Sequence, residues 1–161
     1  LQGITSAFVY VPYFTLQRPW TLLTYMFLHG GLGHIFFNML ALFFFGPRVE
    51  ARIGSRPFLA MYLVAGLFGA GLSAILATGS PILGASAGVF GVSLAFAYFY
   101  PTEQILIWGI IPVQARLLVI LTGLFALFAG FTGAQGGVAH FAHLGGYLGA
   151  YLFLKLNERQ R

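Results

Sequence analysis

The run FLAMYLVAGLFGAGLSAILA at positions 58–77 contains twenty residues and no charged side chain. A helix of this length, rising 1.5 Å per residue, crosses the roughly 30 Å hydrocarbon core of a bilayer. Comparable runs occupy 28–45, 84–100, 116–131 and 140–156, and glycine, proline or charged residues separate them. The sequence therefore predicts an all-α, polytopic membrane helix bundle with five visible spans.

The composition supports a single membrane domain over 1–161. Hydrophobic residues make up 59% of the chain, charged residues 7%, and the mean hydropathy is +0.89. Five spans leave too few residues for a separate soluble domain. The mixed segment 1–19 is predicted to be an outer loop or interfacial segment. The apolar segment 105–113 is too short to cross and is predicted to lie at the interface.

Several residue types are missing, and their absence excludes whole classes of enzyme. The chain has no Asp and no Cys, and its acids are Glu50, Glu103 and Glu158. Aspartyl proteases need a carboxylate pair, and H-E-x-x-H zinc proteases need a Glu beside a His. Neither arrangement exists in this sequence, and thiolate chemistry is excluded in the same way.

Basic residues gather in the loops on one side of the predicted bundle, which marks the cytoplasmic side. These residues are Arg48, Arg52, Arg56, Arg116, Lys155, Arg159 and Arg161, whereas Arg18 lies on the other side. The loops at 78–83 and 132–138 carry no charge. The first, third and fifth spans therefore run inward and the C-terminus is predicted to be cytoplasmic. The net charge of +5 forms no basic face, so nucleic acid is not an expected partner.

This orientation puts the start of the chain outside, so we expect a further helix before residue 1. The expected location is a bacterial cytoplasmic membrane, since the sequence shows no organelle-targeting extension.

Polar residues at membrane depth mark candidate functional positions. Counted from the predicted cytoplasmic end of each span, His34, Ser86 and His143 lie about 18, 21 and 18 Å up. A serine and a histidine at matched height are the minimum for nucleophilic catalysis. No carboxylate is available, so the predicted catalytic unit is a Ser-His dyad.

The surroundings of Ser86 suit an oxyanion. Ser86 begins its predicted helix, where backbone N–H groups lack helical partners and the helix dipole is positive. His34 and Asn38 are i, i+4 on one helix face and both side chains can donate hydrogen bonds. They are predicted members of an oxyanion hole.

Other interpretations of these residues need no catalysis. Gly84 and Gly88 form a small-xxx-small pattern, which by itself favours helix packing. G-x-S-x-G is also the nucleophile elbow of soluble hydrolases, but that motif needs a preceding strand and an acid. His140 and His143 suggest a metal pair, although no acid or thiol is near them in sequence. We therefore expect no metal or cofactor.

Three further expectations concern the spans. His29 is predicted to be interfacial. Small residues at 66, 69, 71 and 73 are predicted to make close helix contact. Polar groups confined to one level do not form a path across the membrane, which disfavours a transporter or channel.

Four stretches in this order resemble the rhomboid family of intramembrane serine proteases. They are FLHGGLGHIFFN at 27–38, GPRVE at 46–50 leading to a glycine at 54, GASAGVFG at 84–91, and AHLGG at 142–146. The resemblance covers residues 20–149. Each stretch alone is a weak signal, but the ordered combination is specific.

The resemblance implies roles for individual residues. Ser86 matches the family nucleophile and His143 its general base, whereas His140 does not match that position. His34 and Asn38 match the residues that support the oxyanion together with the serine N–H. Phe90 falls where an aromatic ring packs beside the histidine. Gly84, Gly88 and Gly146 belong to the supporting motifs.

The implied activity is an endopeptidase that forms an acyl-enzyme and cuts transmembrane segments of other proteins near the outer face. Deacylation predicts a water-accessible cavity on the outer side, capped by mobile segments at 12–20 and 132–138. The alternative is a catalytically silent rhomboid-like protein that binds or escorts membrane proteins. The oligomeric state is left open.

The sequence departs from the family pattern in several places. The family Trp-Arg pair reads Trp20-Thr21 here, with Arg18 nearby, and Ala87 follows the serine where glycine is common. Ala150 is the second small residue of the final packing motif after Gly146. The family core has six helices, and we expect the first of them to precede residue 1. Glu50 and Arg52 match a region where the resemblance implies structural polar contacts.

Overall fold

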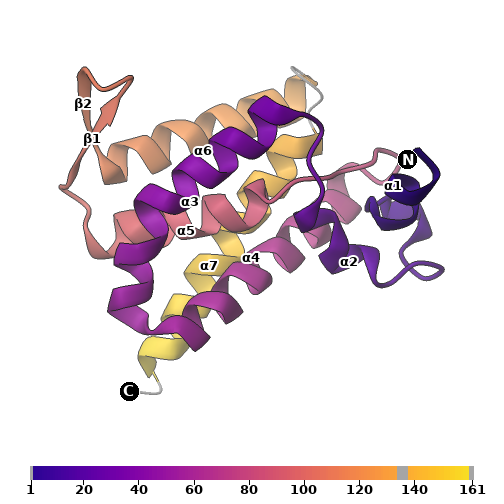
Figure 1. Cartoon of the computed structure of the whole chain (residues 1–161), viewed down its shortest axis with the longest axis horizontal. Coiled ribbons are helices and arrows are strands. Elements are labelled where there is room, and N and C mark those ends of the chain that lie inside the picture. Colours follow the sequence, from indigo (N-terminus) through magenta and orange to yellow (C-terminus); the bar gives the residue numbers. More distant parts are fainter. Residues whose placement is uncertain (1, 134–137, 160–161) are drawn as a thin grey trace.

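The computed structural model describes residues 2–133 and 138–159. Two helices, α1 and α2, and two short 3-10 turns, η1 and η2, precede the five long helices, and a hairpin of strands β1 and β2 lies between α5 and α6 (Figure 1). The bounds are α1 Gln2–Phe8, η1 Pro12–Phe14, α2 Thr21–Thr24, η2 Tyr25–Phe27, α3 Leu32–Ile53, α4 Ser55–Leu76, α5 Ser86–Phe99, β1 Gln104–Ile107, β2 Ile111–Gln114, α6 Ala115–Thr132 and α7 Val138–Arg159.

Helix α5 occupies the centre of the bundle. It contacts α3, α4, α6 and α7, and in Figure 1 it passes behind α3 with α6 on one side and α4 and α7 on the other. Its residues Val92, Ala95 and Phe96 belong to the largest buried apolar cluster. The most extensive helix pair is α4 with α7. A residue on α5 is therefore surrounded by protein, not by lipid.

The outer helices have the character of membrane spans. Helices α3, α4 and α6 are long and apolar enough to cross a bilayer, with mean hydropathies of 1.3, 2.0 and 1.9. Their outward faces carry large apolar side chains such as Phe43 and Phe128, which are 72% and 65% exposed. Such surfaces are stable only in lipid. The protein is an integral membrane protein, as the sequence predicted.

Helix α5 is the shortest of the five long helices. Its 14 residues span about 21 Å, less than the hydrocarbon thickness. The chain before it, 80–85, is therefore non-helical backbone inside the bundle. Such backbone is tolerated at membrane depth where it lines a cavity or is buried in protein.

Small residues let three helices approach one another at the level where α5 begins. A Cβ on Gly69 of α4 would lie 2.7 Å from the Ala87 Cβ and 2.8 Å from the Ala142 carbonyl oxygen. A Cβ on Gly146 of α7 would collide with the Ala87 carbonyl oxygen. One on Gly145 would collide with the Phe68 carbonyl oxygen. Glycine is required at these positions because atoms of the neighbouring helix occupy the space that a side chain would need.

The expectation of close contact along α4 holds in part. Gly66 faces Met26, and Ser73 is fully buried. Gly71 has open space around its Cα, so its prediction was wrong. Gly71 lies two residues from Gly69, which turns it about 200° around the helix axis, away from α7.

The first long helix differs from its predicted bounds. The sequence suggested 28–45, ended by Gly46 and Pro47, but α3 continues through Pro47 to Ile53. A proline inside a helix removes one hydrogen bond without always ending the helix. The helix ends instead at Gly54, whose φ of 92° favours glycine. Its start is later than predicted because Gly30 and Gly31 precede the first turn.

Two segments have more regular structure than expected. Within 1–19, predicted to be a loop, α1 and η1 form, and Arg18 Nη1 and Trp20 Nε1 donate hydrogen bonds to the Ser6 and Ala7 carbonyls. The segment 105–113 forms the antiparallel hairpin of β1 and β2. Its β-branched residues around a tight turn favour strand pairing.

At the end of the bundle far from Ser86, Arg48 makes the polar contacts that were expected of Glu50 and Arg52. Arg48 Nη1 donates to Glu103 Oε1 at 2.8 Å and its guanidinium lies 4.3 Å from the Tyr100 ring centroid. The hydrogen bond from Arg48 lowers the pKa of the Glu103 carboxyl below its usual value. Arg52 lies over the Phe99 ring at 5.7 Å. These contacts join α3 to the end of α5 and the base of the hairpin.

The packing predicts different outcomes for two glycines on α4. Gly69→Ala should lower stability by about 1–3 kcal/mol, because the added methyl overpacks the contact with α5 and α7. Gly71→Ala is the matched control and should leave stability unchanged or slightly raised, because its Cβ meets no atom within 4 Å. Thermal unfolding of both variants in the same detergent measures the difference. Equal stability of the two variants would contradict the packing described.

Candidate active site

Ser86 is the first residue of α5, and the chain before it is held by backbone hydrogen bonds. The Tyr10 and Ile82 backbones exchange hydrogen bonds of 3.2 and 2.8 Å, and the Gly84 N–H donates to the Tyr25 carbonyl at 2.9 Å. The Tyr25 hydroxyl in turn donates to the Gly66 carbonyl of α4 at 2.7 Å. The N–H groups of the first turn of α5 have no helical acceptor and carry the positive end of the dipole.

His143 of α7 lies beside Ser86, as the matched heights predicted. Its Nε2 is 2.8 Å from Ser86 Oγ. The Phe90 ring of α5 stacks on the imidazole with centroids 4.0 Å apart and planes 12° from parallel. This stacking holds the ring plane so that Nε2 faces the hydroxyl. It also confirms the predicted position of Phe90 next to the histidine.

A chain of contacts extends from this pair to α6. Phe90 packs on Tyr147 with centroids 5.1 Å apart. The Tyr147 hydroxyl is 2.7 Å from the Thr122 Oγ1 of α6. The orientation of the stacked ring is thus fixed from three helices.

His34 of α3 approaches Ser86 from the other side. Its Nδ1 accepts a hydrogen bond from the Gly30 N–H at 3.3 Å, so in the neutral ring Nε2 carries the proton. Nε2 points toward Gly84, where an added Cβ would lie 2.6 Å away. Gly84 has φ +126°, a conformation that L side chains rarely adopt. Glycine therefore both permits the turn into α5 and leaves room for the imidazole.

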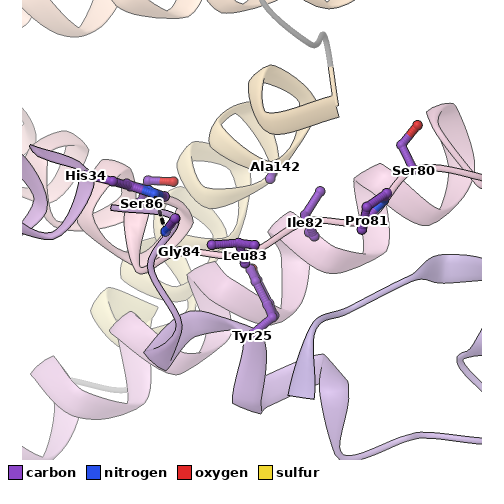
Figure 2. Close-up of a pocket in the computed structure, with 10 residues that line it drawn as sticks. Tyr25, His34, Ser80, Pro81, Ile82, Leu83, Gly84, Ser86 and Ala142 are labelled. Carbon is purple, nitrogen blue, oxygen red and sulfur yellow. Dashed lines mark hydrogen bonds between the residues drawn. The ribbon is translucent and has the colours of Figure 1, made fainter. Parts of the chain in front are cut away.

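His34, Gly84 and Ser86 line a cavity of about 430 Å³. Its lining residues are Tyr25, Gly30, His34, Ser80, Pro81, Ile82, Leu83, Gly84, Ser86 and Ala142. Figure 2 shows His34 and Ser86 at one end, with the segment from Ser80 to Gly84 running along the cavity and Ala142 opposite. The site therefore combines a hydroxyl, an imidazole acceptor and hydrogen-bond donors beside a cavity that runs along the non-helical segment 80–84.

Comparison with known proteins agrees with this arrangement. The family model for the Rhomboid domain matches residues 16–158. The chain belongs to the rhomboid family.

Several rhomboid proteins are similar to this chain. RHOMBOID-like protein 2 of Arabidopsis thaliana is 35% identical over 135 residues, which cover 84% of this chain and 41% of that protein. Rhomboid protease GluP of Bacillus subtilis is 32% identical over 132 residues, covering 82% and 25%. Rhomboid protein 1, mitochondrial, of Saccharomyces cerevisiae is 32% identical over 146 residues, covering 84% and 42%. The chain spans less than half the length of each of these rhomboid relatives.

Asn38 does not line the rhomboid cavity described above. Its side chain is buried and its Nδ2 donates to the His34 carbonyl at 3.0 Å, four residues back on α3. The side chain thus satisfies its own helix, a common alternative for Asn in a helix. Its membership of the oxyanion hole stays a prediction that requires this bond to open.

The other histidines lie apart from the hydroxyl. His140 is buried one turn before His143, with ring centroids 6.0 Å apart and its own ring edge-on to Phe125. The His29 ring packs edge-on to His34 at 5.2 Å. Among residues 2–133 and 138–159, no three His, Cys, Asp or Glu side chains are grouped for a metal ion.

The two remaining glycine motifs have packing roles. A Cβ on Gly88 would lie 2.5 Å from the Tyr62 ring, and Gly146 meets the Ala87 carbonyl. The Ala87 side chain is itself fully buried, so alanine after the serine fits here. Gly84 precedes α5 and faces His34, so the interpretation of Gly84 and Gly88 as one small-xxx-small helix motif was wrong, and only Gly88 packs against a neighbouring helix.

The predicted caps of the cavity are only partly described. Residues 134–137 of the second cap lie outside the described residues. In the first, Phe14 and Arg18 line a neighbouring hollow of about 530 Å³, which shares Pro81 with the cavity beside Ser86.

Sequence reasoning missed Tyr25 and Ile82, which fix the entry to α5 through backbone bonds. Backbone partners leave no side-chain signature. The one available signal was a bulky tyrosine before the His-Gly-Gly stretch, buried to 1% exposure in the structure.

Gly84→Ala should disturb this rhomboid site without unfolding the bundle. The new methyl occupies the position of the His34 ring edge and strains the φ +126° turn, so Ser86 should lose most of its reactivity toward a fluorophosphonate probe. Gly79→Ala in the same loop is the matched control, because its Cβ would meet no atom within 4 Å. Full labelling of Gly84→Ala would show that His34 and the turn can shift without consequence.

Proposed function

We propose that this chain is the membrane domain of an intramembrane serine endopeptidase. The observation that carries the proposal is the 2.8 Å approach of His143 Nε2 to Ser86 Oγ inside the bundle. The name of the relative Rhomboid protease GluP supports the same activity. The acids of this chain lie away from Ser86: Glu50 in the last turn of α3, Glu103 in the loop after α5 and Glu158 in the last turn of α7. The proposed catalytic unit is therefore a dyad.

In the first step, Ser86 Oγ attacks the scissile carbonyl carbon and its proton passes to His143 Nε2. The negative charge that develops on the carbonyl oxygen is stabilised by the N–H groups at the start of α5 and by the His34 Nε2–H. The C–N bond then breaks as His143 returns the proton to the leaving amine. The product of this step is an acyl-enzyme on Ser86.

In the second step, a water molecule gives a proton to His143 and attacks the acyl carbon. The bond between the acyl carbon and Ser86 Oγ breaks, and His143 returns the proton to Oγ, which regenerates the enzyme. The cavity beside Ser86 offers the water a route to this carbon. Phe90 keeps the imidazole plane in place through both proton transfers.

The proposed substrates are transmembrane segments of other proteins, and the bilayer is the proposed environment. A helical segment presents no free peptide bond, so it must unwind locally to lie along 80–84. The basic loops support an orientation with the Ser86 end of α5 outside and the C-terminus in the cytoplasm. A bacterial cytoplasmic membrane is the proposed location, with GluP as a bacterial relative.

A fluorophosphonate probe tests the dyad without knowledge of the substrate. The detergent-solubilised protein should be labelled, Ser86→Ala should lose the label entirely, and His143→Ala should lose about 100- to 10,000-fold in labelling rate. His140→Ala is the matched control on the same helix and should be labelled at a rate near that of the wild type. Cleavage of a reporter transmembrane segment in liposomes should follow the same order.

An unlabelled, folded wild type would contradict the proposal and favour a silent protein that binds membrane proteins. Labelling that survives Ser86→Ala would place the reactive group elsewhere. If His140→Ala were as defective as His143→Ala, the base would be misassigned.

A further inference from the structure

The hairpin of β1 and β2 presents an exposed apolar tip. Trp108 and Ile110 are 81% and 79% exposed, and Leu106 and Ile111 beside them are more than half exposed. These four residues are called the hairpin tip below. A solvated hairpin would carry polar side chains at its turn.

The turn makes the tryptophan more unusual. The Ile110 N–H donates to the Ile107 carbonyl at 3.1 Å, and the residues between them, Trp108 and Gly109, have φ of 56° and 69°. Turns with two positive φ values favour Asn-Gly, because a bulky side chain is strained there. Among the residues that the structure describes, Trp108 is the one non-glycine with positive φ. Neither the turn nor packing within this chain accounts for a tryptophan at this position.

The base of the hairpin is fixed to the bundle. The Ala115 N–H donates to the Glu103 carbonyl at 2.9 Å and the Arg116 N–H to the Pro101 carbonyl at 3.1 Å. Ile105 packs on the main apolar cluster, and Glu103 pairs with Arg48. The tip is therefore held at a defined place relative to α5 and α6.

That place is beside the lipid-facing surface. In Figure 1 the hairpin projects sideways from the start of α6, across the direction of that helix. The outward face of α6 continues from the tip with Leu117, Ile120 and Leu121, which are 45%, 55% and 52% exposed. The charged groups stay at the base, with Glu103 and Arg116.

We propose that the hairpin tip inserts into the interfacial layer of the lipid leaflet at the end of the bundle opposite Ser86. Tryptophan prefers this layer, where its ring is apolar and its N–H meets head groups. Lipid is favoured over a protein partner because the exposed apolar surface continues from the tip onto α6, which is long and apolar enough to span a bilayer. This inference is independent of the proposed protease activity and applies equally to Ser86→Ala.

The test uses the intrinsic fluorescence of the full protein in nanodiscs. The wild-type spectrum minus that of Trp108→Phe isolates Trp108 from Trp20, the other tryptophan of the chain. We expect blue-shifted emission, protection from aqueous iodide, and stronger quenching by a lipid spin label near the head group than by one near the acyl chain end.

Emission like that of tryptophan in water, quenched by iodide and unaffected by either lipid label, would overturn the inference. The inference would also be overturned by blue-shifted emission that neither lipid label quenches and whose blue shift decreases as the protein is diluted in lipid. That result would indicate that a second copy of the chain covers the tip. Should Trp108→Phe fail to fold, Ile110→Cys carrying an environment-sensitive fluorophore gives the same readout, because the chain has no other cysteine.

Discussion

The site depends on the close approach of three helix backbones around Ala87. Gly69 of α4 and Gly146 of α7 each leave space that Ala87 of α5 fills. Helices in lipid gain little from apolar burial against one another, so packing of small residues must hold them together. Ser86 precedes this contact by one residue and His143 follows Ala142, which also takes part in it. The distance between hydroxyl and imidazole is therefore set by packing.

A second constraint comes from the shortness of α5. A full-length span would put its N-terminus at the membrane surface, where water satisfies the free N–H groups. Because α5 begins within the bundle, those groups face a cavity instead. The backbone before α5 is therefore non-helical inside the bundle, and its polar groups need partners. The Tyr10–Ile82 backbone bonds and the bond from the Gly84 N–H to the Tyr25 carbonyl supply them. The short helix that leaves these N–H groups at the cavity is thus the same feature that requires hydrogen bonds to hold the preceding loop.

The sequence predicted the parts of this arrangement that follow from regular helix geometry. Matched heights predicted that Ser86 and His143 lie together, and the misjudged end of α3 did not affect this prediction because the two residues lie on α5 and α7. The rotamer of Asn38 was beyond prediction, since its amide can satisfy either its own helix or a ligand. The hairpin was missed because a short apolar run has no period that separates strand from interfacial helix.

The two ends of the bundle differ in their polar groups. At the Ser86 end, polar groups surround a cavity and the backbone is irregular. At the other end, cations are held over aromatic rings: Arg48 over Tyr100 and Lys155 over Tyr98, whose hydroxyl also donates to Glu158. These contacts join the ends of α3, α5 and α7 to one another. Because α5 runs from these contacts to Ser86, they also help to fix the position of Ser86 within the bundle.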